Sequence, residues 1–217
     1  MLKRRKVLKS KQNLFQPSFC SFLEPNTLKI LGQVMGTYIL AESEAGLMMI
    51  DQHAAHERIV YESLKKRSFS LGVISQDLIV PEILELNFKE SDILFDISGD
   101  LAGLGIIIEP FGQNTFVIKS IPSIIDGKEI KPIIIEIIES IFKDKNDFSK
   151  EKWLDECLIL MSCHRAVRAN KQMNIKEMEK LLEDLEKCDN PMHCPHGRPT
   201  MVTMKRSEME KLFKRVV

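Results

Sequence analysis

The chain has 217 residues, of which 44% are hydrophobic and 29% charged, a composition that excludes an intrinsically disordered chain. Its 31 basic and 31 acidic side chains cancel, so any affinity for nucleic acid must come from local patches. No stretch approaches the roughly 20 uninterrupted apolar residues of a transmembrane helix, and no apolar run follows the basic N-terminus as in a secretory signal. Five cysteines, with no Cys-x-x-Cys pair, favour a reduced, cytoplasmic protein over a disulfide-bonded one.

The first third begins with a basic segment and continues as strands and a helix. Residues 1–24 carry Lys and Arg without periodicity. They are either a solvated tail or linker, or a patch that contacts DNA phosphates. Residues 28–41 and 47–50 are expected to form a hairpin that ends at Asp51, and residues 53–64 a helix.

The middle of the chain, residues 76–148, is rich in Ile and holds most prolines of the folded part. A helix over 90–101 is expected, then strands over 105–109 and 115–121. Pro132 suits the first turn of a helix that runs to Phe142, because its missing N–H costs nothing there. This composition and the predicted mixture of helices and strands indicate an inserted α/β unit.

The last third is predominantly helical. A long, largely buried helix is expected over 153–170, and Asn174 with Glu177 forms a capping box for a helix over 175–187. Residues 188–200 are expected to form a loop or the entry to a strand. Ser207 with Glu210 predicts a final helix, with an apolar side made of Met209, Leu212, Phe213 and Val216. The mixture indicates an α+β or α/β fold.

The segment Asp51-Gln52-His53-Ala54-Ala55-His56-Glu57 is the first candidate metal site. If a helix begins near His53, Glu57 lies one turn on and points the same way, and Asp51 could reach the same point from the strand end. Imidazole and carboxylate at this spacing suit zinc or manganese. The alternative is a helix start stabilised by acidic residues, with His53 simply hydrogen-bonded. Glu62 falls on another face and is expected to be structural.

The second candidate is Cys194-Pro195-His196-Gly197-Arg198-Pro199, which offers a thiolate and an imidazole. In an extended segment, Cys194 and His196 project to one side. Alone this is half a zinc site, but two half-sites in one reduced chain support each other. Cys163, on the predicted long helix, is another soft ligand, and His164 beside it points to an adjacent face.

These motifs resemble, in the same order, those of the endonuclease-type MutL proteins of DNA mismatch repair. Residues 51–62 match the family signature Asp-Gln-His-Ala-x2-Glu-x4-Glu, and residues 194–199 are similar to its Cys-Pro-His-Gly-Arg-Pro segment. Further similarities are Gly32-Gln33, Gly36-Thr37-Tyr38, Phe213-Lys214-Arg215 and Ser162-Cys163-His164, which keeps only the Cys of the family's Ala-Cys-Arg element. The similarity runs from about Leu31 to the C-terminus.

The resemblance implies the C-terminal domain of a MutL protein, with an α+β fold in two subdomains. Residues 25–75 and 149–217 would form a discontinuous dimerisation subdomain that holds the metal site, and residues 76–148 an inserted regulatory subdomain. The implied partners are double-stranded DNA, a second copy in a homodimer and a MutS-type mismatch recognition protein. Since no ATPase motif occurs in these residues, the chain is expected to be a C-terminal fragment or a separately encoded domain.

The resemblance also implies a metal-dependent nicking endonuclease, with metal ligands Asp51, His53, Glu57, Cys163, Cys194 and His196. Phosphodiester hydrolysis needs a metal that polarises the phosphate and activates water. Because thiolate and imidazole favour zinc whereas carboxylates favour manganese or magnesium, we expect Zn²⁺ in a structural or regulatory role at the Cys/His part. Mn²⁺ or Mg²⁺ would then be catalytic at Asp51 and Glu57. Arg215 would lie near a catalytic site, of its own or the partner subunit, and contact phosphate, whereas Phe213 also fits the apolar side of the last helix.

The segment Gln76-Asp77-Leu78-Ile79-Val80-Pro81 resembles the peptide by which MutL docks on the DNA polymerase sliding clamp. The contact residues would be Gln76, Ile79 and Pro81. A buried strand that ends at Pro81 explains the pattern nearly as well.

The leading interpretation is thus an endonuclease domain that nicks double-stranded DNA in mismatch repair. The alternative is a non-catalytic dimerisation and clamp-docking module stapled by zinc. The acidic Asp51 and Glu57 favour the enzyme, because structural zinc sites are usually closed by Cys and His alone. A zinc protease is disfavoured, since His53-x2-His56-Glu57 does not have the order His-Glu-x-x-His.

Overall fold

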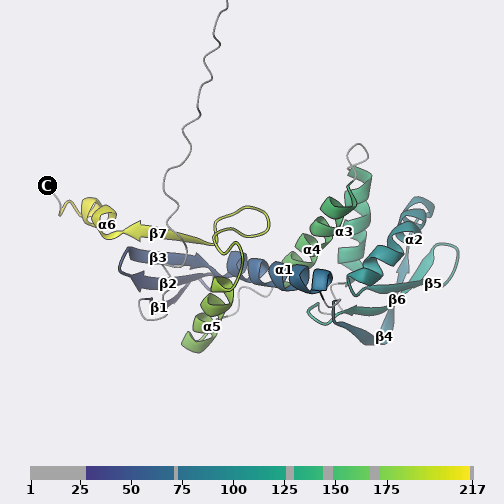
Figure 1. The fold of residues 1–217 in the computed structure, drawn as a ribbon, viewed down its shortest axis with the longest axis horizontal. Coiled ribbons are helices and arrows are strands. Elements are labelled where there is room, and N and C mark those ends of the chain that lie inside the picture. Colours follow the sequence, from purple (N-terminus) through teal and green to yellow (C-terminus); the bar gives the residue numbers. More distant parts are fainter. Residues whose placement is uncertain (1–27, 71–72, 126–129, 144–148, 167–171, 216–217) are drawn as a thin grey trace, which may run out of the picture.

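The structure, a computed structural model, describes residues 28–70, 73–125, 130–143, 149–166 and 172–215. Helix α1 (Gln52–Ser70) runs between two antiparallel sheets (Figure 1). The mixture of helices and sheets confirms the α+β class. Within the described part, no helix has the length and hydropathy needed to cross a membrane. The predicted basic segment 1–24 lies outside the described residues.

The first sheet has the strand order β1-β2-β3-β7. Its strands are β1 (Lys29–Val34), β2 (Tyr38–Ser43), β3 (Gly46–Asp51) and β7 (Met201–Lys205). The prediction of one strand over 28–41 was wrong, because the chain turns back at Met35 and Gly36, whose φ angles are 54° and 62°. Residues 188–200 were predicted to be a loop or the entry to a strand, but the bounds of β7 and its pairing were not predicted. Its partner β3 is far away in sequence, so no local pattern reveals the pairing.

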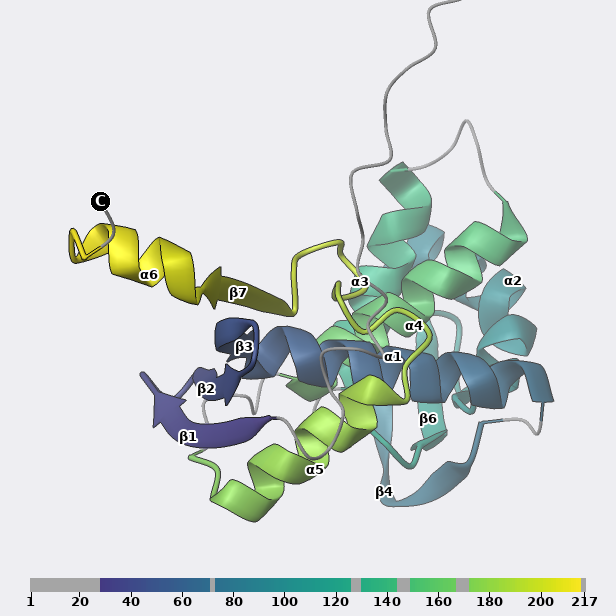
Figure 2. The ribbon, with the colours of Figure 1, turned by 60° about the vertical axis from the view of Figure 1, so that its left-hand side comes forward.

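One face of this sheet is covered by α5 (Ile175–Glu186) (Figure 2). Its stripe of Met178, Leu181, Leu182 and Leu185 packs on the inward side chains of the sheet, Ile39, Ala41, Met48 and Ile50. The predicted capping box is confirmed: Asn174 Oδ1 accepts from Glu177 N at 3.0 Å, and Glu177 Oε2 accepts from Asn174 N at 2.9 Å.

The second sheet has the order β4-β6-β5, with β4 (Ser75–Glu85), β5 (Ile107–Pro110) and β6 (Thr115–Pro122). Helices α2 (Phe88–Gly103) and α3 (Ile130–Lys143) belong to the same part of the chain, and their bounds are close to the predicted ranges. The alternative of a buried strand that ends at Pro81 was wrong, because β4 continues to Glu85. The register of β4 against β6 shifts between Asp77 and Glu82, so the residues between them bulge outward.

Two buried clusters share α1. Ala55, near its start, packs with the first sheet and α5. Val60, Tyr61 and Leu64 pack with the second sheet, α2, α3 and α4 (Lys150–Ala166). Helix α4 begins at Lys150, three residues before the predicted start at residue 153. The part predicted beyond residue 166 lies outside the described residues. The subdomain boundaries at 76 and 148 remain a prediction, since the second cluster includes residues from both sides of them.

The final helix α6 (Arg206–Leu212) follows β7 directly. The predicted Ser207–Glu210 capping box was wrong: the N–H of Lys205 donates to Glu208 Oε2 at 2.8 Å, two residues earlier. The apolar side predicted for this helix is not covered by the rest of the described chain. The helix buries no residue, and Leu212 and Phe213 are 71% and 70% exposed.

Candidate metal centre

The start of α1 is held by segments that are distant in sequence. Asp51 Oδ1 accepts the N–H groups at the second and third positions of the helix, at 2.9 and 3.0 Å, as a helix N-cap does. Gln52 N donates to Thr37 O at 3.0 Å, and Gln33 donates to the side chain of Gln52 at 2.5 Å. Asp51 N donates to Thr200 O at 2.9 Å. These contacts join the two glycine-containing motifs, the acidic motif and the Cys-Pro-His segment.

The loop before β7 is fixed against the middle of α1 by a buried carboxylate. Glu62, only 6% exposed, accepts the backbone N–H groups of Asp189 at 2.6 Å and Asn190 at 3.0 Å. One turn away, Arg58 Nε donates to His193 O at 2.5 Å, and its Nη1 lies 3.6 Å from Glu62 Oε1. The prediction that Glu62 is structural is thus confirmed.

The Cys-Pro-His-Gly-Arg-Pro segment is a closed turn, so the expectation of an extended segment was wrong. Cys194 N donates to Arg198 O at 2.8 Å, and Gly197 N to Cys194 O at 2.9 Å. Gly197 has φ +83°, a conformation that a residue with a Cβ adopts only with strain. The turn buries Cys194 at 1% exposure and leaves the side chain of His196 40% exposed.

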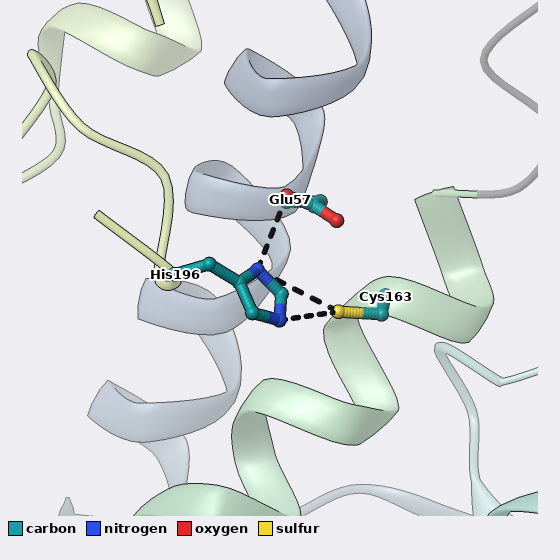
Figure 3. Close-up of side chains that lie close together, drawn as sticks. All are labelled: Glu57, Cys163 and His196. Carbon is teal, nitrogen blue, oxygen red and sulfur yellow. Dashed lines mark hydrogen bonds and ion pairs between the residues drawn. The ribbon is translucent and has the colours of Figure 1, made fainter. Parts of the chain in front are cut away.

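Three of the predicted metal ligands come together from three elements (Figure 3). They are Glu57 on α1, Cys163 on α4 and His196 in the turn. His196 Nε2 lies 3.3 Å from Cys163 Sγ, and His196 Nδ1 lies 3.6 Å from Glu57 Oε2. One ligand atom from each residue can be chosen so that all lie within 4.8 Å of one another.

Glu57 is the buried charge of this cluster, with its side chain only 2% exposed. Its Oε1 lies 3.1 Å from His53 Nε2, and its Oε2 accepts a hydrogen bond from Arg198 Nη2 at 3.0 Å. Burial and then the charge of Glu57 raise the pKa of the Cys163 thiol to about 12. A hydrogen bond to Cys194, followed by the charge of Glu57, raises the pKa of Arg198.

The cluster suits a zinc ion chemically. Carboxylate, thiolate and imidazole are all zinc ligands, and bond lengths of about 2.0–2.3 Å separate tetrahedral ligand atoms by roughly 3.3–3.6 Å. If His196 bound through Nδ1, its separation from Glu57 Oε2, 3.6 Å, would lie in that range, and its separation from Cys163 Sγ, 3.9 Å, would be slightly longer. Bound as a metal ligand, the Cys163 thiol would give up its proton.

Other predicted site residues lie beside this cluster or away from it. Cys194 Sγ is 4.0 Å from His196 Nδ1 but is not one of the mutually close three. Asp51 caps α1 through Oδ1, which leaves Oδ2 as the oxygen for a metal. His164 points to α3, where its Nε2 lies 2.9 Å from Glu136 Oε2.

Arg215 follows α6, which extends away from α4 in both views (Figures 1 and 2). Its guanidinium carbon lies 5.8 Å from the ring centre of Phe213. The structure therefore does not bring Arg215 to the cluster of its own chain, and its predicted role requires a second copy.

Of the predicted clamp-binding residues, Ile79 and Pro81 lie on the outward bulge of β4, and Gln76 lies just before it, paired with Ile121 of β6. Ile79 is fully exposed and Val80 is 75% exposed, and Gln76 and Pro81 are also exposed. Asp77 Oδ1 accepts a hydrogen bond from Ser120 Oγ at 2.5 Å, and Glu82 pairs with Lys131 at 2.7 Å. Both ends of the bulge are thus fixed, while Ile79 and Val80 face solvent.

Residues 31–173 match the sequence profile of the MutL C terminal dimerisation domain. The chain belongs to this family. As a MutL C-terminal domain, it is 37% identical over 190 residues to the DNA mismatch repair protein MutL of Ligilactobacillus salivarius, an alignment that covers 88% of this chain and 29% of that protein. The MutL of Shouchella clausii is 40% identical over 188 residues, which is 86% of this chain and 28% of that protein. The chain spans less than a third of the length of these relatives.

Two features of this MutL C-terminal domain were not predicted from its sequence. The opposite charges of Arg58 and Glu62 are four residues apart, a spacing that could have indicated their pairing. Arg198 was part of a motif but had no assigned role. Its contact with Glu57 joins residues 141 positions apart, so no local signal could have revealed it.

Proposed function

We propose that this MutL C-terminal domain acts in DNA mismatch repair as a metal-dependent endonuclease that nicks double-stranded DNA. The observation that carries the proposal is the convergence of Glu57, Cys163 and His196 from three distant segments. A zinc site with a purely structural role is usually closed by Cys and His, whereas this cluster includes a buried carboxylate. The alternative, a non-catalytic module stapled by zinc, requires Cys163, Cys194 and His196 but gives Glu57 no necessary part.

The donor atoms suggest a division between two kinds of ion. Cys163, Cys194 and His196 would hold Zn²⁺, and the carboxylates of Asp51 and Glu57 would hold Mn²⁺ or Mg²⁺. A divalent ion bound there would supply Lewis-acid stabilisation of the phosphate and activation of water. The residues of the chain itself orient Glu57, through His53 at 3.1 Å and Arg198 at 3.0 Å.

The test is nicking of supercoiled plasmid by the purified chain with manganese at low salt. Wild type should nick, whereas Asp51→Asn and Glu57→Gln should not, and Glu183→Gln on the exposed face of α5 should match wild type. Full activity of Glu57→Gln would refute the proposal. An inactive wild type that nevertheless binds zinc would favour the alternative module. Full activity of Cys194→Ala with manganese in the absence of zinc would support the division between ions.

We also propose that the β4 bulge docks on the DNA polymerase sliding clamp. Its fixed ends and the fully exposed Ile79 reduce the ordering cost of presenting an apolar peptide to a groove. Ile79→Ser should weaken binding to immobilised clamp at least about tenfold, as expected for loss of an interface anchor. Phe95→Ser, which removes an apolar side chain 64% exposed on α2, is the control. Equal binding by wild type and Ile79→Ser would refute this contact.

The homodimer interface that we propose is the outer face of the first sheet. Met49 pairs with Val202 and Leu47 with Met204, so these side chains share the face opposite α5. Met49, Val202 and Met204 are 38%, 51% and 41% exposed in the single chain. Such a contiguous apolar face is typical of a protein–protein interface, and the family is one of dimerisation domains.

A further inference from the structure

Arg198 occupies the boundary between the metal centre and solvent. Its Nη2 lies 3.0 Å from Glu57 Oε2, and its side chain is 60% exposed whereas that of Glu57 is 2% exposed. The guanidinium therefore bonds the buried carboxylate on one side and remains open to solvent over most of its surface. Arg58, which also lies near this site, is 8% exposed and contacts His193 and Glu62.

The backbone of Arg198 is as firmly held as that of the ligands. Its carbonyl accepts the N–H of Cys194 at 2.8 Å, and the adjacent Pro199 is bridged to His193 across the turn. The same closed turn thus delivers His196 to the cluster and the Arg198 guanidinium to its rim. Its position relative to the cluster is set before any substrate arrives.

The charges of the proposed ligands explain the use of a further cation at this rim. Cys163 and Cys194 would bind as thiolates, and Asp51 and Glu57 as carboxylates. These four anionic ligands would balance the charges of the two divalent ions and leave no net positive charge for the substrate. Arg198 adds a positive charge that can attract the negative DNA phosphodiester.

We propose that Arg198 binds the phosphate of the DNA strand at this metal centre, with its guanidinium bridging Glu57 and a phosphate oxygen. The inference rests on the proposed endonuclease function. Guanidinium has five N–H donors in a planar fork and can bond two anions at once, which the ammonium of lysine matches poorly. Arg198 is thus a substrate-binding residue as well as a partner of Glu57.

Two measurements test the proposal on the zinc-loaded chain: binding of a fluorescent DNA duplex over a range of salt concentrations without manganese, and plasmid nicking with manganese. Arg198→Ala should keep its zinc. The slope of log affinity against log salt concentration should become less steep by about one, as expected for one lost phosphate contact. Nicking should fall at least about tenfold. Arg198→Lys should keep the salt slope but nick more slowly than wild type, because it retains the charge and loses the fork. Arg67→Ala is the matched control: Arg67 is exposed on α1, ten residues from Glu57 and therefore about 15 Å along the helix.

An unchanged salt slope for Arg198→Ala with zinc retained would overturn the proposal. Loss of zinc from Arg198→Ala would also overturn it, because Arg198 would then act only by positioning Glu57. An equal fall in slope for Arg67→Ala would show a non-specific loss of charge and have the same consequence. If wild type does not nick, the proposed endonuclease function fails, yet the salt slope still decides whether Arg198 contacts phosphate.

Discussion

Replacing Glu62 should disturb the loop that carries Cys194 and His196. The carboxylate is 6% exposed, accepts two backbone N–H groups of the loop and pairs with Arg58, which is 8% exposed. Glu62→Ala would remove this acceptor from both N–H groups and from Arg58, and also from Lys66, whose Nζ lies 3.6 Å from Glu62 Oε2.

The magnitude follows from these contacts. Hydrogen bonds to a charged group contribute about 1.5–3 kcal/mol each, and removing one partner of a buried ion pair costs about 3–5 kcal/mol. Asp189 and Asn190 are exposed, so water can replace part of what their N–H groups lose. We therefore expect the free energy of unfolding to fall by about 3 kcal/mol in Glu62→Ala. In Glu62→Gln it should fall by about half as much, because one acceptor oxygen remains.

Urea unfolding at one fixed protein concentration measures this effect, since the family dimerises and stability then depends on concentration. Trp153, the single tryptophan of the chain, is 3% exposed in the core and reports unfolding by fluorescence. Glu183→Ala, exposed on α5, should stay within about 0.5 kcal/mol of wild type. Zinc affinity of Glu62→Ala should fall about 10- to 100-fold, as when the support of a metal ligand is removed. Wild-type stability and zinc affinity in Glu62→Ala would refute the reasoning.

Three further predictions concern the metal, the dimer and a cysteine. Zinc at 100 times its dissociation constant should stabilise the chain by about 2.7 kcal/mol relative to the chain with zinc removed by a chelator. Cys163→Ser should remove most of this difference in thermal unfolding. Equal melting temperatures of wild type with and without chelator would contradict this prediction. Met204→Lys should convert the dimer to monomer in analytical ultracentrifugation, whereas Ile135→Lys, on the exposed side of α3, should remain dimeric. Burial and then Glu62 raise the pKa of the Cys188 thiol from 9.0 to about 12, so its alkylation at pH 8 should be about a thousandfold slower than that of a free thiol. The rate, followed by mass spectrometry, should keep rising tenfold per pH unit beyond pH 9, and a plateau near pH 9 would show that the thiol is not shielded.

Most helices of the fold could be predicted from the sequence, because their signals are local. Buried side chains recur at helical spacing in α3 and α5, and the capping box of Asn174 and Glu177 marks where α5 begins. The capping-box pattern gave the wrong start for α6, because Ser207 and Glu210 have the right spacing but the helix starts earlier. A capping pattern indicates that a helix can begin at a residue, whereas tertiary packing decides whether the helix begins at that residue.

Strands were predicted less well, since each depends on a partner elsewhere in the chain. The turn at Met35 and Gly36 divides the segment expected to be one strand into two strands. The strand β7 forms by pairing with the edge of β3. The outward bulge of β4 likewise arises from its register against β6.

By itself the sequence determined the chemistry of this protein, because residue types and motif order fix which side chains are available: a carboxylate at Glu57, thiols at Cys163 and Cys194, and an imidazole at His196. Only the tertiary structure decided which of them meet. It joined Glu57, Cys163 and His196, used one oxygen of Asp51 to cap α1, and brought Arg198 onto Glu57 across 141 residues. The physical reason is that spacing along a helix or turn fixes direction only within that element. The distance between elements is set by the burial of their apolar faces and by anchors such as Glu62, which act between parts of the chain far apart in sequence.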